Sequence, residues 1–212
     1  MTDAPDLAAL VSARLCHDLI SPIGAIGNGL ELIELAGHDA SPELALVGDS
    51  LATALAKLRF FRIAFGPADP DARLPREEAA QICAAMFNGR LAVAWNASDD
   101  MPRPVARLAC LAILCLEKSL PMGGTLALAT PAPDEIALHA AARRTAPPPE
   151  LWAHVETAAP LPELRPDAVQ FALLARALAE TGTRLAARFE ATAAEVRITA
   201  PALSPRPAEA RP

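Results

Sequence analysis

Apolar residues in the first 65 positions of the chain recur with the period of a helix. Over residues 6–36 they are separated by alternating steps of three and four, a pattern typical of helices that pack side by side at a small crossing angle. This apolar seam consists of Cys16, Leu19, Ile23, Ile26, Leu30 and Ile33. Pro22 lies inside the same pattern, where it removes one backbone hydrogen bond, and we expect it to kink or loosen the helix.

A second helix is predicted from Ser41 to Gly66, starting with an N-cap residue that is followed by a proline. Its seam has the same steps and consists of Leu44, Val47, Leu51, Ala54, Leu58, Phe61 and Phe65. Because only about four residues separate the two helices, they should form an antiparallel hairpin. A single hairpin cannot bury such a long seam, so we predict a homodimer in which two hairpins form a four-helix bundle.

Beyond a turn-rich linker at residues 68–72, the pattern changes to helices that alternate with short strands. Helices are predicted at 74–87, 104–120 and 166–181, and strands at 90–95, 125–130, 135–141, 184–190 and 195–200. Such an alternation indicates a two-layer α/β domain, with the last two strands as a closing hairpin. We therefore expect an α+β protein with a helical domain at 1–67, an α/β domain at 73–201 and a disordered tail at 202–212.

Composition and charge exclude several classes of function. The net charge of −6 argues against nucleic acid or an anionic membrane as the main partner. The longest apolar run, around residues 108–116, is about half of the ~18 residues that cross a bilayer. The acidic first residues lack the order of a secretory signal, so we expect a cytoplasmic protein. The four cysteines form no CxxC pair and are expected to be buried, inert thiols.

His17 and Asp18 are the candidate catalytic residues. Winding the first helix at 3.5 residues per turn places His17 off the seam, on an outer face of small and polar residues. That face is shared by Ser21, Gly24, Asn28 and Glu31. An imidazole of ordinary pKa, about 6.5, offers a free ring nitrogen at neutral pH. Asp18 could hold the opposite N–H of the ring and fix its tautomer. The alternative is a solvated helix face with an incidental histidine.

The segment from His17 to Glu31, which reads HDLISPIGAIGNGLE, resembles the phospho-acceptor box of sensor histidine kinases. It is more similar still to histidine phosphotransferases of the ChpT type. The resemblance implies a homodimeric four-helix bundle that carries His17. It also implies that a degenerate α/β sandwich domain, similar to the ATP-binding domain of histidine kinases, follows the bundle.

Features by which such kinases bind nucleotide are absent from the second half of the sequence. Leu111 and Cys115 stand where the kinase helix carries two asparagines, and neither can ligate Mg²⁺. No glycine occurs between Glu135 and Pro166, where the adenine-binding turn should fall, and residues 167–171 replace the glycine-rich lid. Without glycines the backbone cannot approach phosphates closely. We expect no ATP, no cofactor and no metal on this chain.

Phosphate must then reach His17 from another protein. The resemblance implies a receiver domain of a hybrid histidine kinase as donor, a response regulator as acceptor, and a relay that controls the cell-cycle regulator CtrA. The Mg²⁺ of the reaction is expected in the receiver. Residues expected to contact a docked receiver are Arg14, Ser21, Gly24, Asn28 and Glu31. Two alternatives remain: a non-catalytic dimeric module that binds a receiver or kinase, and an active sensor kinase.

Overall fold

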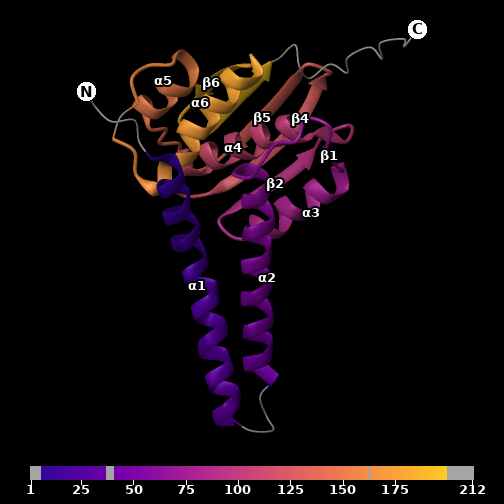
Figure 1. The fold of residues 1–212 in the computed structure, drawn as a ribbon, viewed down its shortest axis with the longest axis vertical. Coiled ribbons are helices and arrows are strands. Elements are labelled where there is room, and N and C mark those ends of the chain that lie inside the picture. Colours follow the sequence, from indigo (N-terminus) through magenta and orange to yellow (C-terminus); the bar gives the residue numbers. More distant parts are fainter. Residues whose placement is uncertain (1–5, 37–40, 162, 200–212) are drawn as a thin grey trace.

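The computed structural model describes residues 6–36, 41–161 and 163–199 of the chain (Figure 1). Its helices are α1 Leu7–Ala36, α2 Ser41–Ala64, α3 Arg76–Met86, α4 Arg103–Ser119, α5 Pro149–Thr157, the short 3-10 helix η2 Pro166–Ala168, and α6 Val169–Thr181. Its strands are β1 Arg73–Leu74, β2 Leu91–Asn96, β3 Met101–Pro102, β4 Gly124–Ala132, β5 Glu135–Ala141, β6 Arg184–Phe189 and β7 Ala193–Thr199.

Helices α1 and α2 lie side by side and form a long hairpin that projects from the sheet (Figure 1). The carboxylate of Asp6 starts α1, because its Oδ1 accepts hydrogen bonds from the backbone N–H groups of Ala8 and Ala9. Pro22 does not interrupt the helix, which runs unbroken from Leu7 to Ala36. The connection between the two helices, residues 37–40, lies outside the described residues.

About half of each predicted seam is covered within one chain: three of six residues in the first seam and four of seven in the second, where Phe65 is half-buried as well. The partly or fully buried positions, seven residues apart, are Leu19, Ile26 and Ile33 of α1 and Val47, Ala54 and Phe61 of α2. The exposed positions, spaced in the same way, are Cys16, Ile23 and Leu30 of α1 and Leu44, Leu51 and Leu58 of α2. The five leucine and isoleucine side chains in this exposed stripe are 48% to 59% accessible. The hairpin therefore leaves an apolar stripe open along both of its helices.

The strands form a five-stranded sheet in the order β2-β4-β5-β7-β6. Strands β2 and β4 are parallel, because α4 crosses between them, and the other neighbours are antiparallel. Side chains of β2 alternate strictly: Leu91, Val93 and Trp95 are buried, and the residues between them are exposed. The sheet thus buries one face, where α4 and α6 pack together. This arrangement agrees with the predicted combination of a helical hairpin and an α/β layer.

Two features were not predicted. The helix expected from residue 74 starts at Arg76, because Arg73 and Leu74 pair with Pro102 and Met101 in a short antiparallel ladder. Helix α5 was also missed. It begins at the end of a proline run and buries Trp152, whose Nε1 donates to the hydroxyl of Ser119 at 2.9 Å.

The root of the hairpin shares a core with the sheet. Phe60, Phe61 and Ile63 near the end of α2 are buried, and Phe60 contacts the ring of Phe87 edge-on at 5.1 Å between centroids. At the start of α1, side chains including Leu10 pack against the same core. The hairpin is therefore anchored at the end where it meets the sheet. The predicted tail at 202–212 lies outside the described residues.

Helix α1 also has the length and composition of a membrane span. Residues Leu7–Ile33 reach a mean hydropathy of 1.2, and only 6% of that window is buried. The uninterrupted apolar runs of the sequence, on which the expectation of a protein without a membrane span rested, are shorter than this helix. Ile23 and Leu30 of the open stripe contribute to the apolar exposure of α1, and Ile20, Leu32 and Leu35, which lie outside the stripe, contribute as well.

Candidate functional site

His17 stands on the outside of α1 with its ring free of the rest of the fold. Its side chain is 83% exposed, while that of the neighbouring Asp18 is only 15% exposed. The Nδ1 of His17 lies 3.0 Å from Oδ1 of Asp18. An ionised carboxylate can only accept, so this hydrogen bond places the ring proton on Nδ1. The Nε2 atom is then the unprotonated nitrogen, and it offers its lone pair to solvent.

The carboxylate of Asp18 is held from its other side by Arg14, one helical turn earlier. The Nε of Arg14 donates to Oδ2 of Asp18 at 2.6 Å, and its Nη1 donates to the backbone carbonyl of Asp167 at 3.0 Å. Asp167 lies in η2 and contacts the ammonium of Lys118. That hydrogen bond from Lys118 holds the pKa of the Asp167 carboxyl below its ordinary value. The orientation of the His17 ring is thus linked to the α/β part of the chain.

Lys57 of α2 makes a second contact with Asp18. Its Nζ donates to the backbone carbonyl of Asp18 at 2.8 Å, across the interface between the two helices. Asp18 is therefore held at its carboxylate by Arg14 and at its carbonyl by Lys57. Lys57 was not predicted as a site residue, because 39 residues separate it from Asp18 along the chain.

Glu117 brings a second carboxylate to this region from α4. Burial raises the pKa of its carboxyl above the ordinary value, and the nearby positive charge of Arg14 opposes part of that rise. The negative charge of Asp18 raises the pKa further, and Lys57 lowers it. The charge of Glu117 therefore interacts with those of Arg14, Asp18 and Lys57. Like Lys57 and Asp167, it belongs to the site only through the tertiary structure.

The outer face predicted around His17 is present. Ser21, Gly24, Asn28 and Glu31 are all exposed on the same side of α1. A methyl group built on Gly24 would meet nothing within 4 Å, so the surface below the histidine is open. Arg14 differs from these residues, since only 15% of its side chain is exposed and its guanidinium is bonded within the chain. Its predicted contact with a receiver stays a prediction.

The positions aligned with the kinase nucleotide site lie in the core. Leu111 and Cys115 of α4 are both 0% exposed. Among residues 6–36, 41–161 and 163–199, no group of three or more His, Cys, Asp or Glu side chains could hold a metal ion.

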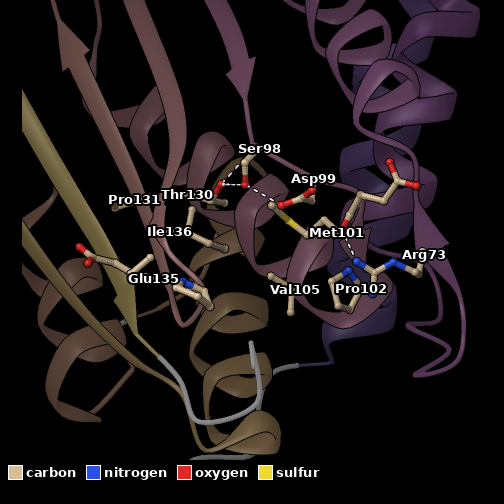
Figure 2. A pocket seen from close by; sticks show the side chains of 13 residues that line it. Arg73, Ser98, Asp99, Met101, Pro102, Val105, Thr130, Pro131, Glu135 and Ile136 are labelled. Atoms are coloured by element: carbon tan, nitrogen blue, oxygen red, sulfur yellow. Dashed lines mark hydrogen bonds between the residues drawn. The ribbon is translucent and has the colours of Figure 1, made fainter. Parts of the chain in front are cut away.

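A pocket of about 550 Å³ opens at the carboxyl ends of β2 and β4 (Figure 2). Its polar groups bond to one another: the hydroxyl of Ser98 contacts Asp99 at 2.9 Å and Thr130 at 3.1 Å, and Arg73 donates to the carbonyl of Asp100. Its floor includes the buried side chain of Met101. The residues that line the pocket differ from those that surround His17.

These features define a protein with an oriented, accessible histidine on a helical hairpin that is rooted in an α/β domain. The chain belongs to the histidine phosphotransferase family: the family described as "Histidine phosphotransferase C-terminal domain" matches residues 76–202. The matched residues are those of the α/β part, and His17 precedes them.

Known proteins that are similar to the chain include a curated relative and a solved structure. The protein phosphotransferase ChpT of Brucella abortus (strain 2308) is 38% identical over 128 residues, which cover 59% of this chain and 61% of that protein. The chain thus matches less than two thirds of the length of this curated relative. A solved structure of a bacterial phosphotransferase is 30% identical, covers 93% of this chain and 98% of its own, and superposes with a TM-score of 0.76.

Proposed function

We propose that the chain is a histidine phosphotransferase of a two-component phosphorelay, in which His17 carries the phosphoryl group. The observation that carries this proposal is the geometry of the His17 ring. Its Nδ1 is bonded to Asp18, so its Nε2 is left as an exposed nucleophile. Membership of the histidine phosphotransferase family and the similarity to the Brucella protein support the same reaction.

The reaction needs two displacements at phosphorus. In the first, the lone pair of Nε2 attacks the phosphorus of an aspartyl phosphate on a receiver, and the bond from phosphorus to the aspartate oxygen breaks. The aspartate leaves as a carboxylate, and the phosphorylated ring keeps its Nδ1 proton and gains positive charge. Asp18 stabilises that charge. In the second displacement, the aspartate of another receiver attacks, and the neutral imidazole leaves.

The chain takes phosphate from a protein donor and not from ATP. The apolar, fully buried Leu111 and Cys115 support this part of the proposal, because they offer no oxygen ligand to a nucleotide-bound Mg²⁺. Phosphoryl transfer still requires neutralisation of charge on the transferred group, and the receiver supplies the Mg²⁺ and the cationic side chain for that purpose. An attempt to detect ATP or ADP binding by calorimetry should therefore give no heat of binding.

The exposed face around His17 is where a receiver docks. Ser21, Gly24, Asn28 and Glu31 supply a surface without bulky side chains, on which the receiver can bring its aspartate to Nε2. The change Gly24→Trp should block docking and leave the oligomeric state unchanged. Transfer at the wild-type rate by this variant would refute the proposed docking face.

The working unit is a homodimer. The open apolar stripe repeats every seven residues on both helices, as in coiled-coil seams, and a second hairpin would cover it in a four-helix bundle. Leu51→Lys should yield monomers in analytical ultracentrifugation, because it places a charge in the stripe. Leu35→Lys is the matched control, because Leu35 is 84% exposed and lies on the side of α1 that carries Asn28. Dimers of the Leu51 variant as stable as wild type would contradict the bundle.

The remaining assignments rest on the resemblance to ChpT-type proteins. The donor is the receiver of a hybrid histidine kinase, the acceptor is a response regulator of a CtrA-type cell-cycle relay, and the chain acts in the cytoplasm. Residues 1–67 serve as the dimerisation and phosphotransfer domain, and residues 73–201 as the degenerate ATP-binding-like domain. Several receivers can be mixed with the phosphorylated chain so that they compete for its phosphoryl group. The receivers that accept the group in this competition would identify the pathway.

A second candidate function is a dimeric module that binds a receiver or kinase without chemistry. The two functions differ in their dependence on His17. Wild type and His17→Gln should be mixed with a receiver that has been phosphorylated beforehand. Label should appear on the wild type only and then move to a second receiver. The binding module is the correct function if no receiver labels the wild type and if wild type and His17→Gln inhibit a partner kinase equally.

A further inference from the structure

Pro22 leaves a gap in the hydrogen bonding of α1 directly beside the candidate phospho-acceptor. In an α-helix each backbone N–H donates to the carbonyl four residues earlier. The partner of position 22 is therefore the carbonyl of Asp18, the residue that orients His17. Proline has no N–H, so this carbonyl lacks its helical donor. A polar group left without a partner between packed helices would be unfavourable.

Lys57 supplies the missing donor from the other helix. Its Nζ lies 2.8 Å from the carbonyl oxygen of Asp18, and its side chain is half-buried between the helices. The flanking position on α2, Ala56, is 4% exposed, so this part of α2 is well packed. A hydrogen bond from an ammonium group is also stronger than the amide bond it replaces.

We propose that Lys57 is a positioning residue for phosphoryl transfer: it replaces the backbone donor that Pro22 lacks and so fixes Asp18 against His17. The proposal rests on the proposed function of His17. Arg14 holds the Asp18 carboxylate, but the direction in which that carboxylate points also depends on the helical turn that carries it. With the carbonyl anchored, Oδ1 stays at 3.0 Å from Nδ1, and the ring keeps its nucleophilic tautomer.

Lys57 and Pro22 should therefore be energetically coupled. Removing the ammonium leaves the Asp18 carbonyl without a partner only while residue 22 is proline. The change Pro22→Ala restores a backbone N–H at that position, and the carbonyl can then be satisfied within α1. Loss of Lys57 should consequently slow the phosphorylation of His17 much less in the Pro22→Ala background.

The test compares Lys57→Met, Lys57→Arg and Pro22→Ala with the double variant Lys57→Met/Pro22→Ala. The matched control is Arg59→Met, which removes a cation from an exposed position of the same helix. Three quantities are measured: the rate of His17 phosphorylation by a prephosphorylated receiver, the ¹⁵N shifts of the His17 ring, and the ¹³C shift of the Asp18 carbonyl. A thermal unfolding curve of each variant identifies any that do not fold.

We expect Lys57→Met to slow phosphorylation about tenfold, less than the roughly hundredfold cost of a 1 Å misplacement, because the contact of Arg14 with Asp18 remains. Its ring nitrogens should shift away from the Nδ1–H tautomer, and the carbonyl signal of Asp18 should move. Lys57→Arg, which keeps a donor, and Arg59→Met should both stay within about threefold of wild type. The double variant should react within about threefold of Pro22→Ala alone.

A wild-type rate and wild-type ring shifts in a folded Lys57→Met protein would overturn the proposal. An equal loss of rate in the Pro22 and Pro22→Ala backgrounds would overturn it as well. Failure of the proposed function looks different, because wild type itself would then accept no phosphate. The ¹⁵N and ¹³C shifts do not require phosphate, so they would still decide the role of Lys57.

Discussion

Replacing Gly29 by alanine should push the two helices of the hairpin apart. Gly29 is a buried position of α1, where the helix meets Val47 of α2. A methyl carbon added to Gly29 would lie 2.4 Å from Cγ2 of Val47. Carbon atoms in contact are normally about 3.5–4.0 Å apart, so the added methyl would overlap Cγ2 of Val47 by about 1.1–1.6 Å. Val47 cannot easily turn away, because β-branched side chains are restricted to one rotamer in a helix.

The net effect on the free energy of unfolding combines two opposing contributions. Overpacking of a tight contact costs about 1–3 kcal/mol. Replacing glycine by alanine inside a helix stabilises it by about 1 kcal/mol. We therefore expect Gly29→Ala to lower the free energy of unfolding by up to about 2 kcal/mol. Gly24→Ala is the matched control in the same helix, where nothing lies within 4 Å, and it should raise stability by about 1 kcal/mol.

The assay is urea denaturation of both variants and wild type at one fixed protein concentration, because an oligomer's stability depends on concentration. The double variant Gly29→Ala/Val47→Ala removes the colliding methyl groups and should recover part of the loss. If Gly29→Ala proved as stable as Gly24→Ala, the close approach of α1 and α2 at this point would be wrong.

Further predictions concern titratable groups. Burial raises the pKa of Glu117, so its contribution to stability is fully present below its unfolded pKa and is lost as pH rises through its folded pKa. Glu117→Gln should therefore raise the melting temperature at pH ~7.5 and have little effect near pH ~4, and an unchanged difference across this range would refute the assignment. Burial also raises the pKa of the Cys83 thiol to about 12 and those of the Cys110 and Cys115 thiols well above their ordinary value. Before unfolding, no thiol other than that of the exposed Cys16 should react with a maleimide, and mass spectrometry can count the labelled cysteines. A second reactive thiol would contradict the packing of the core.

Local periodicity was sufficient to predict the helical hairpin and most of the sheet. The seven-residue repeats mark α1 and α2 because the side chains that meet in a helical pair are neighbours along one stripe. Alternation marks β2, where every second side chain enters the core. The exposed half of each seam follows from the same repeats, although only the structure distinguishes the covered positions from the open ones.

The missed elements depend on partners far away in the sequence. The short strand at Arg73 exists because it pairs with Pro102, and a two-residue strand has no periodicity of its own. Helix α5 begins at the last of three consecutive prolines, which favour a loop, and it is held by the contacts of Trp152 with Ser119 and with the ring of Phe171. Tertiary packing outweighs the local preference in both cases.

The site residues also divide into those that local sequence predicts and those that depend on partners far away in the chain. His17 was identified from the small, polar helix face on which it lies, and Asp18 was identified because it is the next residue in the sequence. Their hydrogen bond is a local contact. The contacts of Arg14 with Asp167 and of Lys57 with Asp18 span 153 and 39 positions. The sequence does contain one signal for the second contact, since Pro22 deprives a known carbonyl of its donor. It cannot tell which residue of the partner helix replaces that donor.

The most direct test of the account is the position of phosphorus on the phosphorylated chain. Protein labelled with ¹⁵N in histidine should be phosphorylated by a receiver and studied by ³¹P–¹⁵N correlation at alkaline pH, where phosphohistidine persists. The hydrogen bond between Nδ1 and Asp18 predicts a single phosphorus coupled to Nε2 of His17, and no such signal in His17→Gln. Phosphorus on Nδ1, or on another residue of a protein that still relays phosphate, would contradict the central claim.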